Sequence, residues 1–315
     1  MRASRTRSSS ASARVSVAEL VIGLFGPTAS GKSDVAAALS ELIPAEVVSA
    51  DAMQVYDGLP ILTNRSPHPE RLVGIWPLSH SASVGEFAPL AHAAIDEALA
   101  AARTPLVVGG TGLYFRAALA ELELPSAPPP GARERWEAIY DEHGADAAHT
   151  RLAELDPAAA ERIHANDRRR VVRALELAEA GGSLVPRREQ LFEGAWRHPT
   201  LVVGLDVPEP ELERRIAERT RRMFERGVED EARAALAAEP SATAEKVIGL
   251  HEVATLRREE AIDALIVRTR RYAAYQRKWL RRLEGVVIVA ADRPPEETAA
   301  EIVELARTRE RLSRP

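Results

Sequence analysis

The sequence predicts an α/β fold in which a parallel sheet is flanked by helices and carries an all-helical insertion. Strand-like runs alternate with helical segments along most of the chain, which is typical of a parallel sheet covered on both faces. The first strand-like run leads directly into a glycine-rich turn. Strand signals then stop between residues 125 and 196, where only helical patterns remain.

The strand-like runs cover residues 20–25, 46–49, 106–108 and 201–205, and residues 286–290 are a further candidate. Helical patterns cover residues 34–42, 84–102 and 211–225. We therefore predict a core of residues 19–124 and 197–315, ending in basic helices, and a helical insertion domain over residues 125–196. Residues 1–18, rich in Ser, Ala and Arg, are predicted to be a disordered arm, with a transit peptide as the alternative.

The composition excludes several classes of protein. With 45% hydrophobic residues in a chain of 315, a core can be buried. No apolar run approaches the roughly 18 residues of a membrane span, so we expect no membrane partner. The lack of cysteine excludes disulfides and thiolate metal sites and suits a cytoplasmic protein. A net charge of −5 argues against a uniformly basic nucleic-acid surface, but local basic grooves remain possible.

Eight consecutive residues fit the phosphate-binding pattern G-x-x-x-x-G-K-[ST], between a predicted strand and a predicted helix. They are Gly26, Pro27, Thr28, Ala29, Ser30, Gly31, Lys32 and Ser33. We predict that the backbone N–H groups and Lys32 bind a diphosphate, and that the Ser33 hydroxyl ligates Mg²⁺. The core is thus expected to be P-loop NTPase-like. The P-loop alone does not name the reaction, since kinases, ATPases and GTPases all use it.

Two more motifs follow predicted strands. In S-A-D-A-M-Q-V-Y, residues 49–56, Asp51 is expected to face the phosphate site, because ligands bind at the carboxyl ends of parallel strands. A helix-capping or turn-forming aspartate is the alternative. In G-G-T-G-L-Y-F, residues 109–115, the glycines indicate either close approach to a ligand or a tight turn. This motif stands where a Walker B acid is usually found, which argues against an ordinary ATPase.

These three motifs, in this order and spacing, resemble those of bacterial tRNA dimethylallyltransferases, also called tRNA isopentenyltransferases. Residues 162–167 (R-I-H-A-N-D), 173–176 (R-A-L-E) and 248–249 (I-G) strengthen the resemblance, which covers roughly residues 21–285. It implies transfer of a dimethylallyl group from dimethylallyl diphosphate to the exocyclic N6 amine of the adenine immediately 3′ of the tRNA anticodon, with release of pyrophosphate. It further implies Mg²⁺ as cofactor and the tRNA anticodon stem-loop as partner. We expect a cytoplasmic monomer.

The resemblance also implies catalytic roles. Lys32 would stabilise the departing pyrophosphate, and Thr111 would hydrogen-bond the phosphate end near the breaking bond. Asp51 would accept a hydrogen bond from the adenine amine and take its proton. Arg215 and Arg219 match family arginines near the pyrophosphate, and of these we predict Arg215 as the catalytic one.

Basic residues at helical spacing provide one group of predicted tRNA contacts, and the resemblance to the family implies the others. Positions 268, 271, 275, 278 and 282 share one helix face, while Thr269, Tyr272, Gln276, Trp279 and Leu283 form another face that we predict to be core. A solvated charged face is the alternative for the basic stripe. The residues expected to bind tRNA are Asp51, Ala52, Met53, Gln54, Arg133, Arg169, Arg170, Arg173, Arg271, Tyr275 and Lys278.

Three segments depart from the family pattern. Residues 62–67 read L-T-N-R-S-P where Gly-Thr-Ala-Lys-Pro is usual, the His-His-Leu-Ile-Asp stretch expected before residue 83 is absent, and residues 248–252 read I-G-L-H-E in place of Ile-Gly-Tyr-Lys/Arg-Glu. They leave open whether the RNA preference is that of the family.

Three other functions remain open on the sequence. An adenylate isopentenyltransferase acting on free nucleotide would need neither the long insertion nor the basic helices. A P-loop small-molecule kinase would turn over ATP and would not need the basic stripe. A non-catalytic RNA-binding protein is disfavoured because Lys32, Ser33, Asp51 and Thr111 are all intact.

Overall fold

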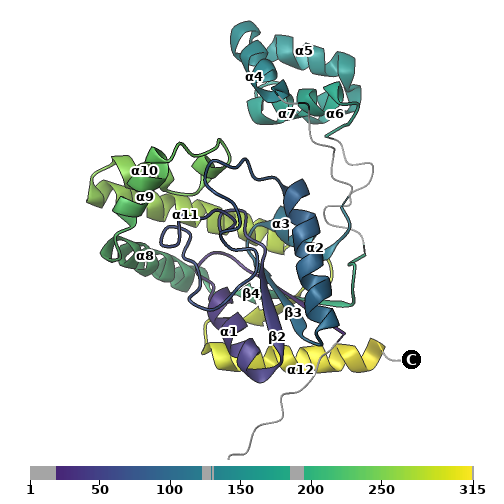
Figure 1. The fold of residues 1–315 in the computed structure, drawn as a ribbon, viewed down its shortest axis with the longest axis vertical. Coiled ribbons are helices and arrows are strands. Elements are labelled where there is room, and N and C mark those ends of the chain that lie inside the picture. The colour runs from purple at the N-terminus through teal and green to yellow at the C-terminus, as the bar shows by residue number, and fades with distance from the viewer. Residues whose placement is uncertain (1–18, 123–128, 130, 185–194, 314–315) are drawn as a thin grey trace, which may run out of the picture.

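A computed structural model of the chain describes residues 19–122, 129, 131–184 and 195–313. The predicted disordered arm and most of the proline-rich hinge lie outside these described residues. Within them, five strands form one parallel sheet in the order β2-β3-β1-β4-β5 (Figure 1). The strands are β1 (Val21–Phe25), β2 (Ala45–Ser49), β3 (Thr104–Gly109), β4 (Thr200–Asp206) and β5 (Val287–Ala290).

The observed strands confirm all four predicted runs and the late candidate, with ends shifted by one or two residues. The register aligns their carboxyl ends, since Phe25 lies opposite Gly109 on one side and Gly204 on the other. Ser49 likewise lies opposite Val108. The P-loop and the turns that follow β2 and β3 therefore emerge at the same edge of the sheet.

The two faces of the sheet bury separate hydrophobic clusters. Alternate residues of β1 belong to one cluster or the other, because successive side chains of a strand point to opposite faces of the sheet. Val21 and Phe25 belong to the cluster that includes Phe115, and Ile22 and Leu24 to the other. Helices α2 (Val84–Ala100), α3 (Gly112–Leu119), α9 (Val228–Ala237), α10 (Leu250–Thr255) and α11 (Arg258–Leu280) contribute to the first cluster, and α1 (Lys32–Leu42) and α12 (Pro295–Ser313) to the second.

Helix α8 (Glu209–Glu225) packs along α11, and the short 3₁₀ helix η1 (Ala244–Lys246) precedes α10. The predicted helices at 34–42, 84–102 and 211–225 correspond to α1, α2 and α8. Local sequence explains where α2 starts: the Ser83 hydroxyl accepts a bond from the Glu86 N–H, while the Glu86 carboxylate accepts from Ser83 N.

Four helices form a separate bundle with its own small core. They are α4 (Ala132–His143), α5 (Ala145–Leu155), α6 (Pro157–Arg162) and α7 (Arg168–Glu179). Leu152, Val171 and Leu175 are completely buried among them. Figure 1 shows this bundle standing clear of the sheet and its helices. The described part of residues 125–196 contains no strand, although the exact domain boundaries stay predictions.

Contacts beside the bundle fix the returning chain to the core. Trp196 forms an antiparallel bridge with Ala120, and the Arg116 guanidinium lies 4.2 Å from the centre of the Trp196 ring. Arg197 pairs with Asp96 at 3.0 Å and with Glu121 at 2.8 Å. Over the described residues, no helix is both long and apolar enough to cross a membrane.

Candidate active site

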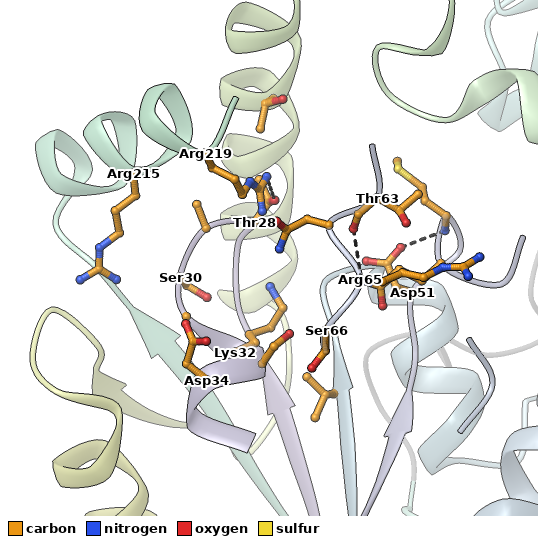
Figure 2. A pocket seen from close by; sticks show the side chains of 18 of the residues that line it. Thr28, Ser30, Lys32, Asp34, Asp51, Thr63, Arg65, Ser66, Arg215 and Arg219 are labelled. Carbon is orange, nitrogen blue, oxygen red and sulfur yellow. Dashed lines mark hydrogen bonds between the residues drawn. The ribbon is translucent and has the colours of Figure 1, made fainter. Parts of the chain in front are cut away.

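A cleft of about 630 Å³ opens at the carboxyl edge of the sheet. The P-loop forms its floor, and Asp51, residues 62–67, α8 and α11 contribute to its walls (Figure 2). Of the four predicted catalytic residues, Lys32, Asp51 and Arg215 line the cleft. Thr111 is joined to the Asp51 turn, because its Oγ1 accepts a hydrogen bond from Ala52 N at 3.2 Å.

The P-loop has the shape of an anion-binding turn. Ala29 and Gly31 have φ values of +64° and +88°, and such left-handed residues turn successive N–H groups toward one point. Lys32 Nζ donates to the carbonyl oxygens of Gly26 and Pro27 at 2.9 and 2.8 Å, which holds the ammonium over the loop. Burial, opposed by the charge of Asp51, lowers the pKa of Lys32 to about 8.

Two buried polar atoms beside the loop lack hydrogen-bond partners among the described residues. Ser30 Oγ and Arg219 Nε are both buried, and neither has a hydrogen-bond partner in the described structure. Burying such groups unpaired is costly, whereas a diphosphate would accept from both. The residues of the cleft thus fit a diphosphate ligand.

Asp51 follows β2 and projects into the cleft, as Figure 2 shows. Its Oδ1 accepts from Met53 N at 2.9 Å, which makes a local turn and fixes the carboxylate. The turn-forming role and the predicted facing toward the phosphate site are therefore both present. A carboxylate held in this way can accept a hydrogen bond from an amine that enters the cleft.

The two arginines of α8 differ in their contacts. Arg219 reaches the P-loop and donates to Thr28 Oγ1 at 2.5 Å. Burial lowers the pKa of Arg219 to about 10. The charge of Asp51 opposes this shift, and the charge of Arg222 adds to it. Arg215 instead pairs with Glu211 at 2.7 Å and donates to the Ala291 carbonyl at 3.1 Å. In Figure 2 its guanidinium lies on the opposite side of the P-loop from Asp51.

Polar contacts of α11 with the cleft were missed by the sequence. Tyr272 and Gln276 were predicted to be core, and they do face inward. However, the Tyr272 hydroxyl lies 3.1 Å from Thr111 Oγ1, and Gln276 Oε1 accepts from Thr28 N at 2.7 Å. Burial raises the pKa of Tyr272, so its hydroxyl stays protonated. The available signal was that Tyr272 and Gln276, four residues apart, place polar groups on a helix face predicted to be core.

Neither close approach to a ligand nor a tight turn, the two explanations offered by the sequence, accounts alone for the glycines of G-G-T-G. A Cβ on Gly109 would lie 2.4 Å from the Ala50 carbonyl oxygen, and one on Gly110 would lie 2.1 Å from Gln276 Nε2. A Cβ on Gly112 would lie 2.1 Å from Trp279 Cδ2. Each glycine therefore leaves room for another part of the protein, and at Gly110 and Gly112 that part is a side chain of α11.

Two carboxylates that the sequence did not single out also shape the cleft. Glu231 on α9 accepts hydrogen bonds from the N–H groups of Ile61 and Leu62 at 2.8 and 2.7 Å, and so holds the segment that departs from the family pattern. Glu70 lines the cleft. Burial raises the pKa of Glu70, and the nearby charge of Asp51 raises it further.

The predicted tRNA-binding residues fall into three groups. Asp51, Ala52, Met53 and Gln54 lie at the cleft, where Gln54 Nε2 donates to Thr63 O at 3.2 Å. Arg271, Tyr275 and Lys278 are exposed along α11, with Tyr275 53% exposed. Neither Arg271 nor Lys278 forms an ion pair with any described residue, so both charges are available to a partner.

The third group lies on the helical bundle. Arg133 and Arg173 approach the same buried carboxylate, Glu176, at 3.9 and 2.8 Å. Arg170 pairs with Asp167 at 3.6 Å, whereas Arg169 has no ion-pair partner within the described ranges. The bundle also affects Lys246 in η1. Burial lowers the pKa of Lys246, and the charges of Arg133 and Arg169 lower it further. The side chains of Arg133 and Arg169 on the bundle are therefore close enough to Lys246 of the core to influence its charge.

A metal ion at this cleft would depend on few protein ligands. The described residues contain no group of three His, Cys, Asp or Glu side chains that could hold a metal ion. Ser33 lines the cleft at the start of α1, and its hydroxyl makes no hydrogen bond to a described residue. One hydroxyl together with phosphate oxygens and water is a set that Mg²⁺ accepts, so the site fits that ion.

Comparisons with known proteins agree with one another. The IPP transferase family model matches residues 54–283. A tRNA dimethylallyltransferase of Thermobifida fusca is 40% identical over 87% of this chain and 91% of its own length. One of Acidothermus cellulolyticus is 40% identical over 96% of this chain and 98% of its own length.

Solved structures give the same picture. The tRNA isopentenylpyrophosphate transferase of Bacillus halodurans has a TM-score of 0.66 at 31% identity, over 93% of this chain and 99% of that chain. A eukaryotic dimethylallyltransferase acting on tRNA has a TM-score of 0.75 at 25% identity, over 94% of this chain and 80% of that chain.

Proposed function

The chain belongs to the IPP transferase family, and we propose that it transfers a dimethylallyl group from dimethylallyl diphosphate to the N6 amine of the adenine immediately 3′ of a tRNA anticodon. The observation that carries this proposal is the convergence of Lys32, Asp51 and Thr111 at the carboxyl edge of the sheet. A diphosphate site and a carboxylate acceptor for an amine then share one cleft.

The reaction breaks the allylic C–O bond, and its electron pair leaves with the pyrophosphate. Backbone N–H groups of the P-loop, together with Lys32, stabilise that charge. The amine nitrogen forms the new bond to the allylic carbon, and its proton passes to Asp51. The Met53 N–H already fixes the carboxylate, so positioning contributes more than basicity.

The arginine that binds the pyrophosphate is, in this proposal, Arg219. Its Nε has no partner among the described residues, and its terminal nitrogen already contacts Thr28 of the P-loop. Arg215, the residue favoured by the sequence, is committed to Glu211 and Ala291. Arg215 stays a prediction as a second contact at the outer side of the loop.

Mg²⁺ is the proposed cofactor, held by Ser33 and by phosphate oxygens. When bound, the ion neutralises charge on the diphosphate. The other proposals concern partners and setting: dimethylallyl diphosphate as the donor, a monomeric state and a cytoplasmic location.

The anticodon stem-loop is proposed to lie between α11 and the helical bundle. The exposed charges of Arg271 and Lys278 face it from the core, and Arg169 faces it from the bundle. The target adenine must leave its stack to reach Asp51, as in other enzymes that modify a base. Tyr275, more than half exposed, is available to stack on a neighbouring base.

The alternatives are weaker on specific observations. A kinase that uses a P-loop needs an acid near the end of the third strand for its metal, but β3 ends at Gly109. An enzyme acting on free adenylate would have no use for unpaired cations on two separate elements.

Transfer of labelled dimethylallyl diphosphate in the presence of Mg²⁺ tests the proposal, with unmodified tRNA, AMP and ATP as parallel acceptors. We expect label in tRNA alone. Label in AMP or ATP would instead establish an adenylate isopentenyltransferase. Without any transfer, ATP hydrolysis or phosphoryl transfer would establish the kinase.

A further inference from the structure

Helix α11 makes more specific contacts with the phosphate-facing loops than core packing requires. The side chain of Gln276 is 1% exposed and uses both ends of its amide. Oε1 accepts from Thr28 N in the P-loop at 2.7 Å, and Nε2 donates to Gly110 O after β3 at 3.0 Å. A single side chain therefore joins the P-loop to the β3–α3 turn.

A second contact comes from the preceding helical turn. Tyr272 precedes Gln276 by four residues and so lies on the same helix face. Its hydroxyl lies 3.1 Å from Thr111 Oγ1, which also accepts from Ala52 N. The face of α11 that carries Gln276 thus reaches the turn containing Asp51 through one intermediate hydroxyl.

The amide of Gln276 packs closely against both loops. A Cβ on Gly110 would lie 2.1 Å from Gln276 Nε2 and 3.1 Å from the Gly26 carbonyl oxygen. The amide consequently lies where the two loops come close together. Its chemistry is also restricted: Thr28 N requires an acceptor and Gly110 O requires a donor, and of the side chains of this length only glutamine supplies both without charge.

We propose that Gln276 is a positioning residue that fixes the distance between the P-loop and the β3–α3 turn, and so aligns the diphosphate with Asp51 and Thr111. The proposal rests on the proposed function, because the diphosphate between these loops is taken to be the prenyl donor. Gln276 acts through the loops that it joins.

The variant Gln276→Met tests this role, since methionine has similar length and forms neither hydrogen bond. We expect the Kd for inorganic pyrophosphate to rise, and kcat/KM for dimethylallyl diphosphate to fall, by about tenfold or more. The Kd for tRNA should change less than about twofold, because the RNA-facing side chains of α11 are untouched. Hydrogen exchange of a P-loop peptide should become faster.

The control is Thr200→Val, which removes a buried hydroxyl at the amino end of β4, whereas the cleft opens at the carboxyl edge of the sheet. It should leave the affinity for pyrophosphate and the kinetics unchanged. Wild-type pyrophosphate affinity and wild-type kcat/KM in folded Gln276→Met would overturn the proposal. A parallel loss of tRNA affinity would also overturn it, because the effect would then come from the position of α11 as a whole.

If Gln276→Met fails to fold, Gln276→Glu serves in its place. Glutamate keeps the shape and the acceptor for Thr28 N but loses the donor to Gly110 O. Pyrophosphate binding should again weaken about tenfold or more, and wild-type affinity would overturn the proposal. If the wild-type protein transfers no prenyl group to tRNA, the proposed function fails, while the pyrophosphate affinities still decide the role of Gln276.

Discussion

Replacing Glu231 with glutamine tests how the wall of the cleft is held. Glu231 Oε2 accepts from Ile61 N at 2.8 Å, and Oε1 accepts from Leu62 N at 2.7 Å. Oε1 also accepts a longer bond of 3.1 Å from Ile61 N. A glutamine with its amide oxygen in the Oε1 position keeps both Oε1 bonds, but it turns its NH₂ toward Ile61 N in place of Oε2. The substitution therefore removes the 2.8 Å bond and places an NH₂ group against the Ile61 N–H, which keeps only the longer bond.

A hydrogen bond to a charged acceptor contributes about 1.5–3 kcal/mol. The loss acts on local opening of residues 59–66, because Glu231 is the α9 side chain that binds this segment. Each 1.4 kcal/mol corresponds to roughly a tenfold change, so exchange protection of the two amides should fall by about ten- to a hundredfold. Leu62 and Thr63 line the cleft, so kcat/KM should fall by about tenfold.

Hydrogen-exchange mass spectrometry of a peptide covering residues 59–66 measures the opening, and steady-state kinetics measures its effect. The matched control is Asp230→Asn, since Asp230 is the exposed neighbour and pairs only with Arg233 among the described residues. Unchanged exchange in Glu231→Gln would refute the reasoning. It would show that other contacts hold the segment, such as Arg65, which donates to Tyr56 O and pairs with Asp57 at 3.2 Å, and Gln54, which donates to Thr63 O.

Four further outcomes follow from the site. Asp51→Asn should lower kcat by about 10²–10⁴-fold while tRNA still binds in a gel-shift assay, because the proton acceptor is lost; near-normal turnover would exclude that role. Arg219→Met should raise the KM for dimethylallyl diphosphate about tenfold or more, and an effect only in the Arg215→Met comparison would restore the original choice. Arg271→Ala should reduce the slope of log K for tRNA against log salt by about 0.7, and an unchanged slope would make the stripe a solvated face. Glu70→Gln should lower the KM for the diphosphate at pH 8, because it removes a negative charge from the cleft. The pKa of the wild-type carboxyl is raised, so as the pH falls through that pKa the carboxyl becomes neutral and the difference in KM should vanish. A KM ratio that stays the same as the pH is lowered from 8 until the protein begins to unfold would contradict this.

The sequence predicted what depends on local pattern. Short apolar runs between turn residues predicted the strands, and the P-loop was recognised because its glycine, lysine and serine spacing is contiguous. Asp51 and Thr111 could be placed together because the carboxyl ends of parallel strands share one edge. The register, with Phe25 opposite Gly109, shows that edge directly.

Contacts between distant segments could not be predicted in the same way. Nothing local distinguishes Glu231 from the other acidic residues of α9, because its partners lie 170 positions earlier in the chain. The choice between Arg215 and Arg219 depends on where α8 crosses the P-loop, and the periodicity of α8 cannot specify that crossing. The pairing of Glu211 with Arg215 depends on that crossing as well.

Helix α11 combines both kinds of information. Its basic face and its core face were each visible as periodic patterns, one residue apart at Arg271 and Tyr272, and at Tyr275 and Gln276. A shift of one residue rotates a side chain by about 100°, so the two faces are neighbours on the same cylinder. The pattern could not show that Gln276 on the core face accepts a hydrogen bond from Thr28 N of the P-loop. A helix that presents an exposed basic face on one side and contacts the P-loop on the other cannot move without shifting both faces, which is why kinetics and tRNA affinity must be measured separately for every variant in it.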